Sequence, residues 1–234
     1  MEKLKDKNVL VVGASGTIGK ETAKLLAGSG ANVFICGRNS ERIQETAHEA
    51  GIPLAQSFIV DITKPDDIAA MAAALPTLDA LINTAGIGII KPFETLTFEE
   101  LQQSIEVNLF GTFHLLKAFL PAMKEQKKGL IIHLPGVLGK TPMAGATAYA
   151  ASKYALNGMM KSLREELKRT DIRITQVFLG GVDSRFWDSI DLRVQRDKMI
   201  IAEEAAKAIW FLCQQPISGV VSEMVIQPFN HQVI

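Results

Sequence analysis

The chain has 234 residues, 47% of them apolar and 21% charged, and its 25 Lys and Arg balance its 25 Asp and Glu. This length predicts one compact domain, since α/β folds commonly reach roughly 250 residues as a single unit. Zero net charge provides no broad positive field for a nucleic-acid backbone or an acidic membrane, and no apolar run approaches the ~18 residues that span a bilayer. We therefore expect neither nucleic acid nor a membrane as a partner.

The cysteines and the first residues indicate a compartment. Cys36 and Cys213 stand in apolar strings, where a free thiol behaves as a small buried hydrophobe. The N-terminal residues carry charge and no apolar segment of the signal-peptide type. We predict two structural thiols and a reducing, cytoplasmic location.

Short apolar segments alternate with longer segments of helical period, which is the pattern of repeated βα units in a doubly wound parallel sheet. Strands are expected at residues 9–12, 32–36, 55–60, 80–82, 130–134, 173–178 and 223–226. The sequence also predicts long helices over 98–123 and 147–168, with Thr97 and Glu100 spaced as a capping box. Thr63 is expected to cap the helix entered at Pro65.

The first strand passes through a glycine-rich turn directly into a helix. Gly13, Gly16 and Gly19 permit a tight turn, a close approach of backbone to a pyrophosphate, and close packing of helix on strand. The helix opening at Thr17 and Ile18 presents N–H groups and the positive end of its dipole to phosphates. A dinucleotide-binding turn is therefore predicted, and a plain glycine-rich βα turn is the alternative.

The second strand ends without a carboxylate to accept a ribose 2′-hydroxyl. Arg38 stands there instead, and its guanidinium suits a 2′-phosphate, with Ser15 and Asn39 placed to add hydrogen bonds. This favours NADP(H) over NAD(H), which stays possible if Arg38 is only a surface residue at a helix start.

Tyr149 and Lys153 are four residues apart in a predicted helix, so both lie on one face. A tyrosine is a poor acid or base at neutral pH, and a neighbouring positive charge favours its phenolate. The pair therefore predicts a general acid–base site.

The chain resembles the short-chain dehydrogenase/reductase family over essentially its whole length. The motifs that carry the resemblance are the glycine turn, Asp61, Asn83-Thr84-Ala85-Gly86, Asn108, Tyr149 with Lys153, and Gly180-Gly181-Val182-Asp183-Ser184. The resemblance implies a Rossmann-type fold that binds a dinucleotide, with hydride moving between nicotinamide C4 and a carbonyl or alcohol carbon.

The resemblance also implies further cofactor contacts, in residues that follow three other strands. They are Asp61 and Ile62 at the adenine ring, Asn83, Ala85 and Gly86 along the cofactor, and Gly180, Val182 and Ser184 beside the nicotinamide. Thr84 replaces the second Asn of the family motif, and Leu179 replaces its Pro.

For the chemistry, the resemblance implies Tyr149 as general acid when a carbonyl is reduced. Lys153 would hold the nicotinamide ribose and lower the pKa of Tyr149, and Asn108 would position a water that links Lys153 to solvent. An Asn inside a long helix has a plainer alternative, which is to bend the helix or to hydrogen-bond its neighbours.

One catalytic position departs from the family. The family's serine lies thirteen residues before the tyrosine, where this chain has Gly136. That hydroxyl hydrogen-bonds the substrate oxygen, a contact whose loss costs roughly 10²–10³ in rate. Thr141, Thr147 or a water could stand in, and activated carbonyls remain possible substrates.

His133 lies in the strand before Gly136, on the face opposite Leu134 and Gly136, which predicts a structural role. The other histidines are scattered without metal-ligand spacing, so no metal site is predicted.

The segment at about 185–200 follows the nicotinamide motif and is expected to form a substrate lid. Its Phe186, Trp187 and Ile190 indicate an apolar pocket, with core packing as the alternative. A homodimer or homotetramer is expected through the two long helices, with apolar surface from Phe110, Phe113, Phe119, Met159 and Met160.

Two functions follow. The leading hypothesis is an NADP(H)-dependent oxidoreductase acting on a small carbonyl or secondary alcohol. The alternative is a sensor or regulatory protein that binds the dinucleotide with weak or no catalysis, because Gly136 lacks the serine hydroxyl. A scaffold without cofactor is a third, weaker reading.

Overall fold

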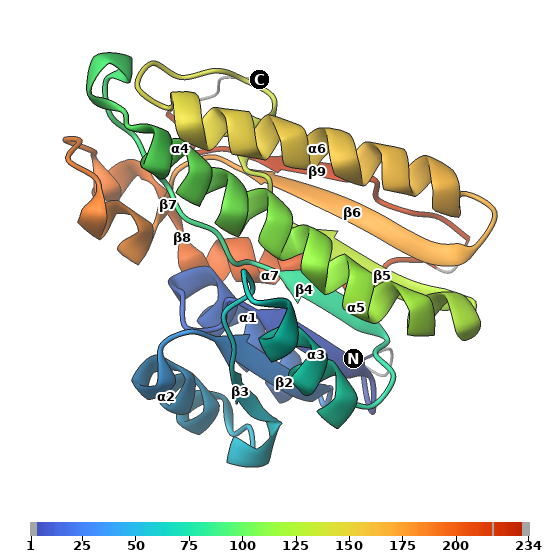
Figure 1. Cartoon of the computed structure of the whole chain (residues 1–234). Helices are drawn as coiled ribbons and strands as arrows, with labels where there is room; N and C mark the ends of the chain where they lie inside the picture. Colours follow the sequence, from blue (N-terminus) through green and yellow to red (C-terminus); the bar gives the residue numbers. More distant parts are fainter. Residues whose placement is uncertain (1–3, 217, 231–234) are drawn as a thin grey trace.

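The computed structural model describes residues 4–216 and 218–230. Seven parallel strands form one sheet in the order β3-β2-β1-β4-β5-β6-β9 (Figure 1). They are β1 (Asn8–Val12), β2 (Asn32–Gly37), β3 (Ser57–Ile59), β4 (Ala80–Asn83), β5 (Lys128–His133), β6 (Asp171–Leu179) and β9 (Glu223–Ile226). The doubly wound sheet is confirmed, although β3 is shorter than expected because residues 54–56 form a 3₁₀ turn.

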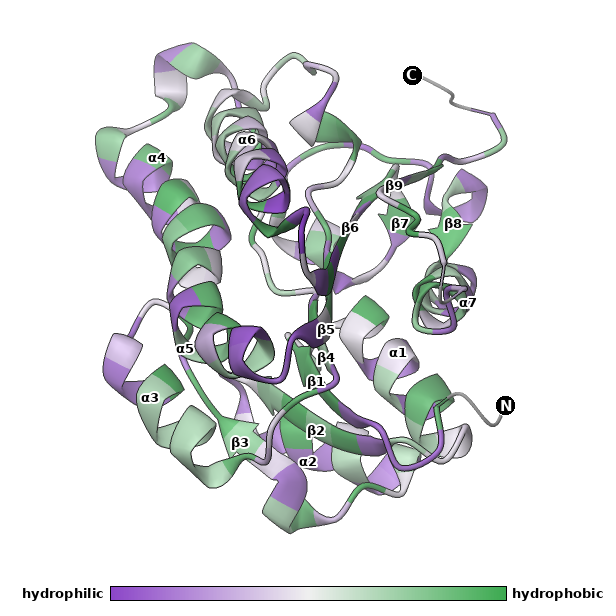
Figure 2. Ribbon diagram, turned by 90° about the vertical axis from the view of Figure 1, so that its right-hand side faces the viewer, coloured by the Kyte–Doolittle hydropathy of each residue, from purple (hydrophilic) through white to green (hydrophobic). Residues whose placement is uncertain are grey.

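Helices cover both faces of the sheet, which is seen nearly edge-on in Figure 2. One layer holds α3 (Pro65–Ala74), α4 (Phe98–Ile105), α5 (Gly111–Glu125) and α6 (Thr147–Leu167). The other holds α1 (Thr17–Gly28), α2 (Ser40–Ala50) and α7 (Ala202–Leu212). None of the described helices is long and apolar enough to cross a membrane.

Two apolar cores lie between these layers. In β1, Val9 and Val11 face the layer of α1 and α7, whereas Leu10 and Val12 face the layer of α5 and α6. All four side chains are at most 1% exposed, so the central strand is apolar on both sides, as a parallel sheet requires.

The chain changes direction in the sheet between β1 and β4. From β1 it builds outward to β2 and β3, then returns to place β4 on the other side of β1 and continues to β5, β6 and β9. The carboxyl ends of β1 and β4 meet at this switch point, where doubly wound sheets bind ligands.

The helix predicted over residues 98–123 is interrupted. A π-helical turn at Glu106–Phe110 separates α4 from α5, and it places Asn108 on the inner side, 1% exposed. Such turns frequently mark functional sites. The capping box of Thr97 and Glu100 is confirmed, whereas Lys64, not Thr63, occupies the N-cap position of the helix that begins at Pro65, without a side-chain capping hydrogen bond.

The segment between β6 and α7 folds into short elements. β7 (Val182–Asp183) pairs in parallel with β8 (Ile200–Ile201), and between them lie 3₁₀ turns at Arg185–Ser189 and Arg196–Lys198. Ile190, expected to line a pocket, is instead buried.

The apolar residues of the long helices divide between surface and core. Phe110 and Phe113 are exposed, whereas Phe119 and Met160 are buried in the core and are not available to a partner. Cys36 and Cys213 are free, and burial raises the pKa of each thiol to about 12.

Candidate functional site

The glycine turn after β1 is packed against backbone. A Cβ at Gly13, where φ is +83°, would lie 2.7 Å from the Ala85 nitrogen, and one at Gly19 would lie 2.5 Å from the Gly13 oxygen. Gly16 is the N-cap of α1, and its N–H donates to the Gly13 carbonyl. Only glycine fits at Gly13 and Gly19, so the start of α1 approaches the switch point more closely than any side chain would allow.

Beside this turn lies a cavity of about 140 Å³ at the ends of β1, β2 and β4. Its lining includes Ser15, Arg38, Asp61 and Ile62 from the predicted set. Although partial burial opposes it, hydrogen bonds from Thr63 and the charge of Arg38 keep the pKa of the Asp61 carboxyl below its usual value.

Two predicted phosphate-side residues are engaged elsewhere. The Asn39 side chain accepts from the Arg42 N–H as the cap of α2, and Asn39 does not line the cavity. The Thr17 hydroxyl accepts from the Arg185 N–H at 3.3 Å, which joins the first turn of α1 to the segment after β7.

The end of β4 is held by buried amides. Asn83 accepts from the Ala85 N–H and donates to the Thr112 hydroxyl. Asn108 accepts from the Ile87 N–H at 2.9 Å and donates to the Ile87 carbonyl at 3.0 Å. The π-helical turn is thus joined through Asn108 to the segment that follows β4, 21 residues away in the chain.

Tyr149 and Lys153 project from one face of α6, as the spacing predicts. The Lys153 ammonium lies 5.5 Å from the Tyr149 ring centroid and donates to the Leu134 carbonyl at 3.1 Å. It also lies with Asn108 against Gly86, where a Cβ would be 3.2 Å from Lys153 Nζ and 3.0 Å from Asn108 Oδ1. The structure therefore brings Tyr149, Lys153, Asn108 and Gly86 together.

Burial dominates the electrostatics of this pair. It lowers the pKa of Lys153 to about 8 and raises the pKa of Tyr149 above its ordinary value. The expected lowering of the tyrosine pKa by Lys153 is not found in the protein alone, because removing a phenolate from water outweighs the attraction of the ammonium.

The comparisons with known proteins agree with this geometry. Residues 7–194 match the family model described as short chain dehydrogenase. The chain belongs to the short-chain dehydrogenase family. An uncharacterised oxidoreductase of Staphylococcus epidermidis is 33% identical over 232 residues, which cover 97% of this chain and 100% of that relative. The protein is thus an oxidoreductase of this family, and the resemblance found in the sequence is confirmed.

Solved structures of other short-chain dehydrogenases superpose closely. An alcohol dehydrogenase from the archaeon Thermococcus sibiricus, complexed with 5-hydroxy-NADP, is 25% identical with a TM-score of 0.88, over 98% of this chain and 100% of that one. A metagenomic short-chain oxidoreductase in complex with NADP is 32% identical with a TM-score of 0.81, over 97% and 98%.

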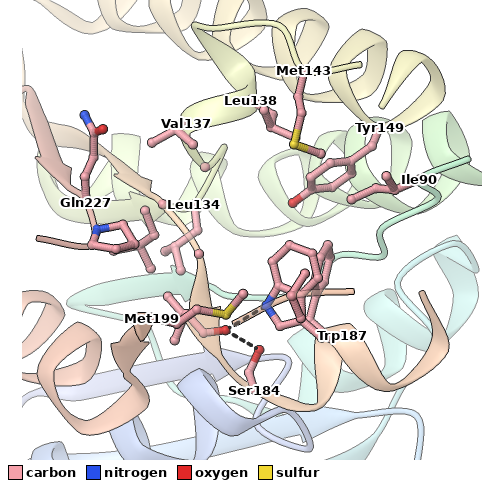
Figure 3. A pocket seen from close by; sticks show the side chains of 18 of the residues that line it. Ile90, Leu134, Val137, Leu138, Met143, Tyr149, Ser184, Trp187, Met199 and Gln227 are labelled. Carbon is pink, nitrogen blue, oxygen red and sulfur yellow. Dashed lines mark hydrogen bonds between the residues drawn. The ribbon is translucent and has the colours of Figure 1, made fainter. Parts of the chain in front are cut away.

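A second, larger cavity of about 670 Å³ opens beside Tyr149 in this short-chain dehydrogenase (Figure 3). The Tyr149 hydroxyl points into it. Gly180, Val182 and Ser184, the residues expected beside the nicotinamide, are among those that line it, and the Ser184 hydroxyl donates to the Val182 carbonyl. The two cavities adjoin, because residues 84–86 line both, and we refer to the pair as the groove at the switch point.

Gly136 has a backbone conformation that glycine adopts readily and other residues rarely do. Its φ is +69° and its ψ is 168°, a region that costs a side-chain-bearing residue about 1–3 kcal/mol. Space is not the obstacle, because a Cβ there would lie 3.9 Å from the Tyr149 hydroxyl and 3.5 Å from the Leu179 carbonyl. The loop is therefore shaped around glycine.

His133 faces away from the cavity. It is 1% exposed, lies in register with Asn83 and Gln176, and neither ring nitrogen has a hydrogen-bond partner among the described residues. Burial and then the charge of Lys153 hold the pKa of His133 well below its usual value. Across residues 4–216 and 218–230, no group of three His, Cys, Asp or Glu could hold a metal.

Several lining residues are absent from the sequence predictions. They include Thr84, Leu134, Val137, Leu138, Met143, Leu192, Val194, Met199 and Gln227. Thr84 had a signal, because it stands at a motif position; its hydroxyl donates to the Val12 carbonyl and packs beside Gly13 and Gly19. The others lie at strand ends and in loops, are apolar except for Gln227, and carry no local pattern.

Proposed function

We propose that this short-chain dehydrogenase transfers a hydride between NADP(H) and the carbonyl or secondary alcohol of a small molecule. One observation carries the proposal: the Tyr149 hydroxyl points into a large apolar cavity that adjoins the cavity of the glycine turn, with residues 84–86 lining both. A nicotinamide dinucleotide needs such a groove, with its phosphates at one end and its reactive ring at the other.

The residues present fit this cofactor. Gly13, Gly16 and Gly19 leave backbone surface and a helix N-terminus open to the pyrophosphate, and Arg38 offers its guanidinium to a 2′-phosphate. Ser184 would meet the carboxamide. The NADP complexes of two similar structures support the choice of NADP(H), and NAD(H) stays possible.

The chain's own residues would manage the proton. When bound, NADPH supplies a hydride from nicotinamide C4 to the carbonyl carbon and is left as NADP⁺. Tyr149, which burial keeps protonated, hydrogen-bonds the carbonyl oxygen and gives it the proton as the alcohol forms. Lys153 would hold the ribose and return a proton to Tyr149, and Asn108 fixes the segment after β4 against which Lys153 lies.

A second function is favoured by one observation, the glycine conformation at Gly136. Without a hydroxyl at this position, a dinucleotide-binding sensor or regulator with weak or no turnover is the alternative. It shares the cofactor with the first proposal and differs only in chemistry.

A pair of measurements tests both. Energy transfer from Trp187 or Trp210 to NADPH reports binding, and a screen of carbonyl compounds followed by NADPH absorbance reports turnover. Binding with turnover supports the oxidoreductase, and tight binding without turnover of any carbonyl supports the sensor. Absence of binding at millimolar cofactor would sink both proposals.

The cofactor preference has its own test. Arg38→Ala should weaken NADPH by roughly 10–100-fold, the loss expected for charge-assisted hydrogen bonds, and leave NADH within about threefold. Arg42→Ala, an exposed arginine one turn along α2, is the matched control and should change neither. Equal losses for both cofactors in Arg38→Ala would remove the preference.

We also propose residues 185–200 as a substrate lid of the domain. Arg196 ties its two ends together, donating to Asp183, to Asp188 and, at 2.7 Å, to the Ser184 carbonyl. Arg196→Gln should raise the KM for a ketone more than the Kd for NADPH. An equal change in both would argue against a substrate lid.

We also propose that the protein forms a homodimer or a homotetramer. Phe110 and Phe113 are exposed on the π-helical turn and on α5, and they would supply apolar surface to a second copy in a homodimer or homotetramer. Size-exclusion chromatography of Phe113→Glu tests this. A wild-type monomer would contradict it directly.

A further inference from the structure

The large cavity has almost no charge in its walls. Among the described residues that line it, the charged side chains are Lys153 and Lys198, and there is no carboxylate. Apolar walls face each other across it, with Val137, Leu138 and Met143 on one side and Trp187 and Met199 on the other (Figure 3). Such walls favour a ligand with an apolar body and exclude a cationic one, whose charge would be buried unpaired.

An aromatic corner adjoins the Tyr149 hydroxyl. The Phe186 ring lies 5.6 Å from the Tyr149 ring, tilted by 48°, and 5.1 Å from the Trp187 ring, at 84°. Phe186 presses so closely on Gly88 that a Cβ there would lie 2.1 Å from the ring. Edge and face surfaces of this kind suit a planar ring, so an aryl group next to the reacting carbonyl fits best.

The polar groups near that carbonyl are few. Of the hydroxyls in the cavity walls, those of Thr84 and Ser184 donate to backbone carbonyls, while Tyr149 and Thr141 have no such bond among the described residues. Gly136 contributes none, and its backbone conformation disfavours any residue that would. With one polarising donor missing, a ketone must be electron-poor already to react at a useful rate.

We therefore propose that the cavity selects apolar aryl ketones whose carbonyl is activated by a second, vicinal carbonyl. This inference rests on the proposed oxidoreductase function and names the substrate class of the same site. The aryl ring occupies the corner of Phe186 and Trp187, the reacting oxygen takes the Tyr149 hydrogen bond, and the neighbouring carbonyl supplies the electron withdrawal that Gly136 cannot.

Three ketones separate the two requirements. Phenylpropanedione has the ring and the vicinal carbonyl, propiophenone has the same body without activation, and diacetyl has activation without the ring. We expect kcat/KM with NADPH to be highest for phenylpropanedione. The ratio of kcat/KM for phenylpropanedione to kcat/KM for propiophenone should exceed the ratio of their borohydride reduction rates by at least tenfold. The kcat/KM for diacetyl should be at least tenfold lower than that for phenylpropanedione.

Binding is read separately from turnover. In Trp210→Phe, the remaining tryptophan is Trp187, in the cavity wall, so ligand quenching reports this site. Trp210 lies on α7 and donates to Ser29, outside the cavity. Both phenyl ketones should quench Trp187 at similar concentrations, and diacetyl only at far higher ones.

Position 136 offers a matched pair of variants. Gly136→Ser and Gly136→Ala carry the same backbone strain and differ by one hydroxyl, which Ser would place near the Tyr149 oxygen. The preference for the diketone should be at least tenfold smaller in Gly136→Ser than in Gly136→Ala. In Thr141→Val it should stay as in the wild type, because the proposal gives the Thr141 hydroxyl no bond to the ketone oxygen.

The need for an activated carbonyl, the aryl class and the oxidoreductase function are each contradicted by a different result. A diketone preference no larger than that of borohydride, an equal preference in the Ser and Ala variants, or a larger preference in Thr141→Val would overturn the need for activation. Diacetyl turned over or bound as well as phenylpropanedione would overturn the aryl class. Quenching by both phenyl ketones without any turnover would leave the ligand class standing and defeat the oxidoreductase function itself.

Discussion

The two halves of the groove are fixed in different ways. At the end of β1, a Cβ on Gly19 would lie 2.5 Å from a backbone oxygen, so main chain touches main chain. At the end of β5, a Cβ on Gly136 would meet nothing within 3.4 Å, and the surrounding walls are side chains from separate loops. Backbone contact tolerates almost no substitution, whereas side-chain walls can be exchanged singly. The first half therefore suits a cofactor that stays the same while the sequence changes. The second half suits a substrate that is particular to one protein, because its walls can be altered residue by residue.

The largest expected effect lies at the junction of the halves. Tyr149→Phe removes the proton donor and keeps the ring, so kcat for ketone reduction should fall by roughly 10²–10⁴-fold, the usual contribution of a general acid. NADPH affinity, measured by energy transfer, should change by less than about threefold, because in the proposed binding mode the dinucleotide is held mainly by the other half. Stopped-flow absorbance and fluorescence provide the two readings.

Tyr154→Phe is the matched control. Tyr154 is the second tyrosine of the chain, one turn along α6, and its hydroxyl donates to the Lys140 carbonyl at the surface. Its kcat should stay near that of the wild type. If Tyr149→Phe retained more than a tenth of the activity, the assignment of the general acid would be wrong.

The next effect tests the rigidity of the glycine half. In Gly19→Ala the new methyl would meet the Gly13 oxygen and, at 2.7 Å, the Thr84 hydroxyl. Because the first contact is backbone, α1 must shift, at a cost of about 1–3 kcal/mol in unfolding free energy. NADPH binding should weaken at least tenfold, as the helix N-terminus moves away from the phosphates.

Gly28→Ala serves as the comparison, since it lies in the same helix with nothing within 4 Å of its Cβ. Denaturant unfolding should show it to be as stable as the wild type or slightly more stable, because alanine favours helix. Equal stability of Gly19→Ala and Gly28→Ala would contradict the close packing.

The same contrast explains how much could be predicted from sequence. Inner strands such as β1 and β4 were predictable because their apolar runs are buried on both faces, and the glycine turn because its spacing follows from backbone contact. The π-helical turn at Asn108 was not, since the helical period continues through it and the wider turn depends on the tertiary bonds to Ile87. Met143 and Gln227 come to line the same cavity only through the fold.

Titration of Lys153 should have a smaller effect, a decrease in kcat/KM at alkaline pH. Burial lowers its pKa in the folded protein to about 8, so its protonated fraction falls as pH rises through that value. Since the ammonium supplies protons to Tyr149 in the proposed reduction, kcat/KM for a ketone should fall about tenfold per pH unit above the pKa. A pH–rate profile from pH 6 to 10 in the presence of saturating NADPH measures it.

Lys198→Gln distinguishes the two lysines of the cavity. Lys198 is exposed at the rim, so its loss should leave the position of the alkaline limb unchanged. If the alkaline decrease in kcat/KM disappeared in Lys198→Gln, the titrating group would be Lys198 and not Lys153.

The smallest effect is expected from His133. It lies at the end of β5, in register with Asn83 of β4 on one side and Gln176 of β6 on the other. Its folded-state pKa is well below the ordinary 6.5, because burial and the charge of Lys153 oppose protonation. As pH falls below that ordinary value, the unfolded chain takes up a proton that the folded chain refuses, so stability is lost by at most about 1.4 kcal/mol per pH unit. His133→Leu should flatten this acid dependence in urea unfolding between pH 7 and 5, whereas His48→Leu, at an exposed position on α2, should retain it. An unchanged slope in His133→Leu would mean that the imidazole takes up its proton in place, and the layer under the site would then be polar enough to carry charge.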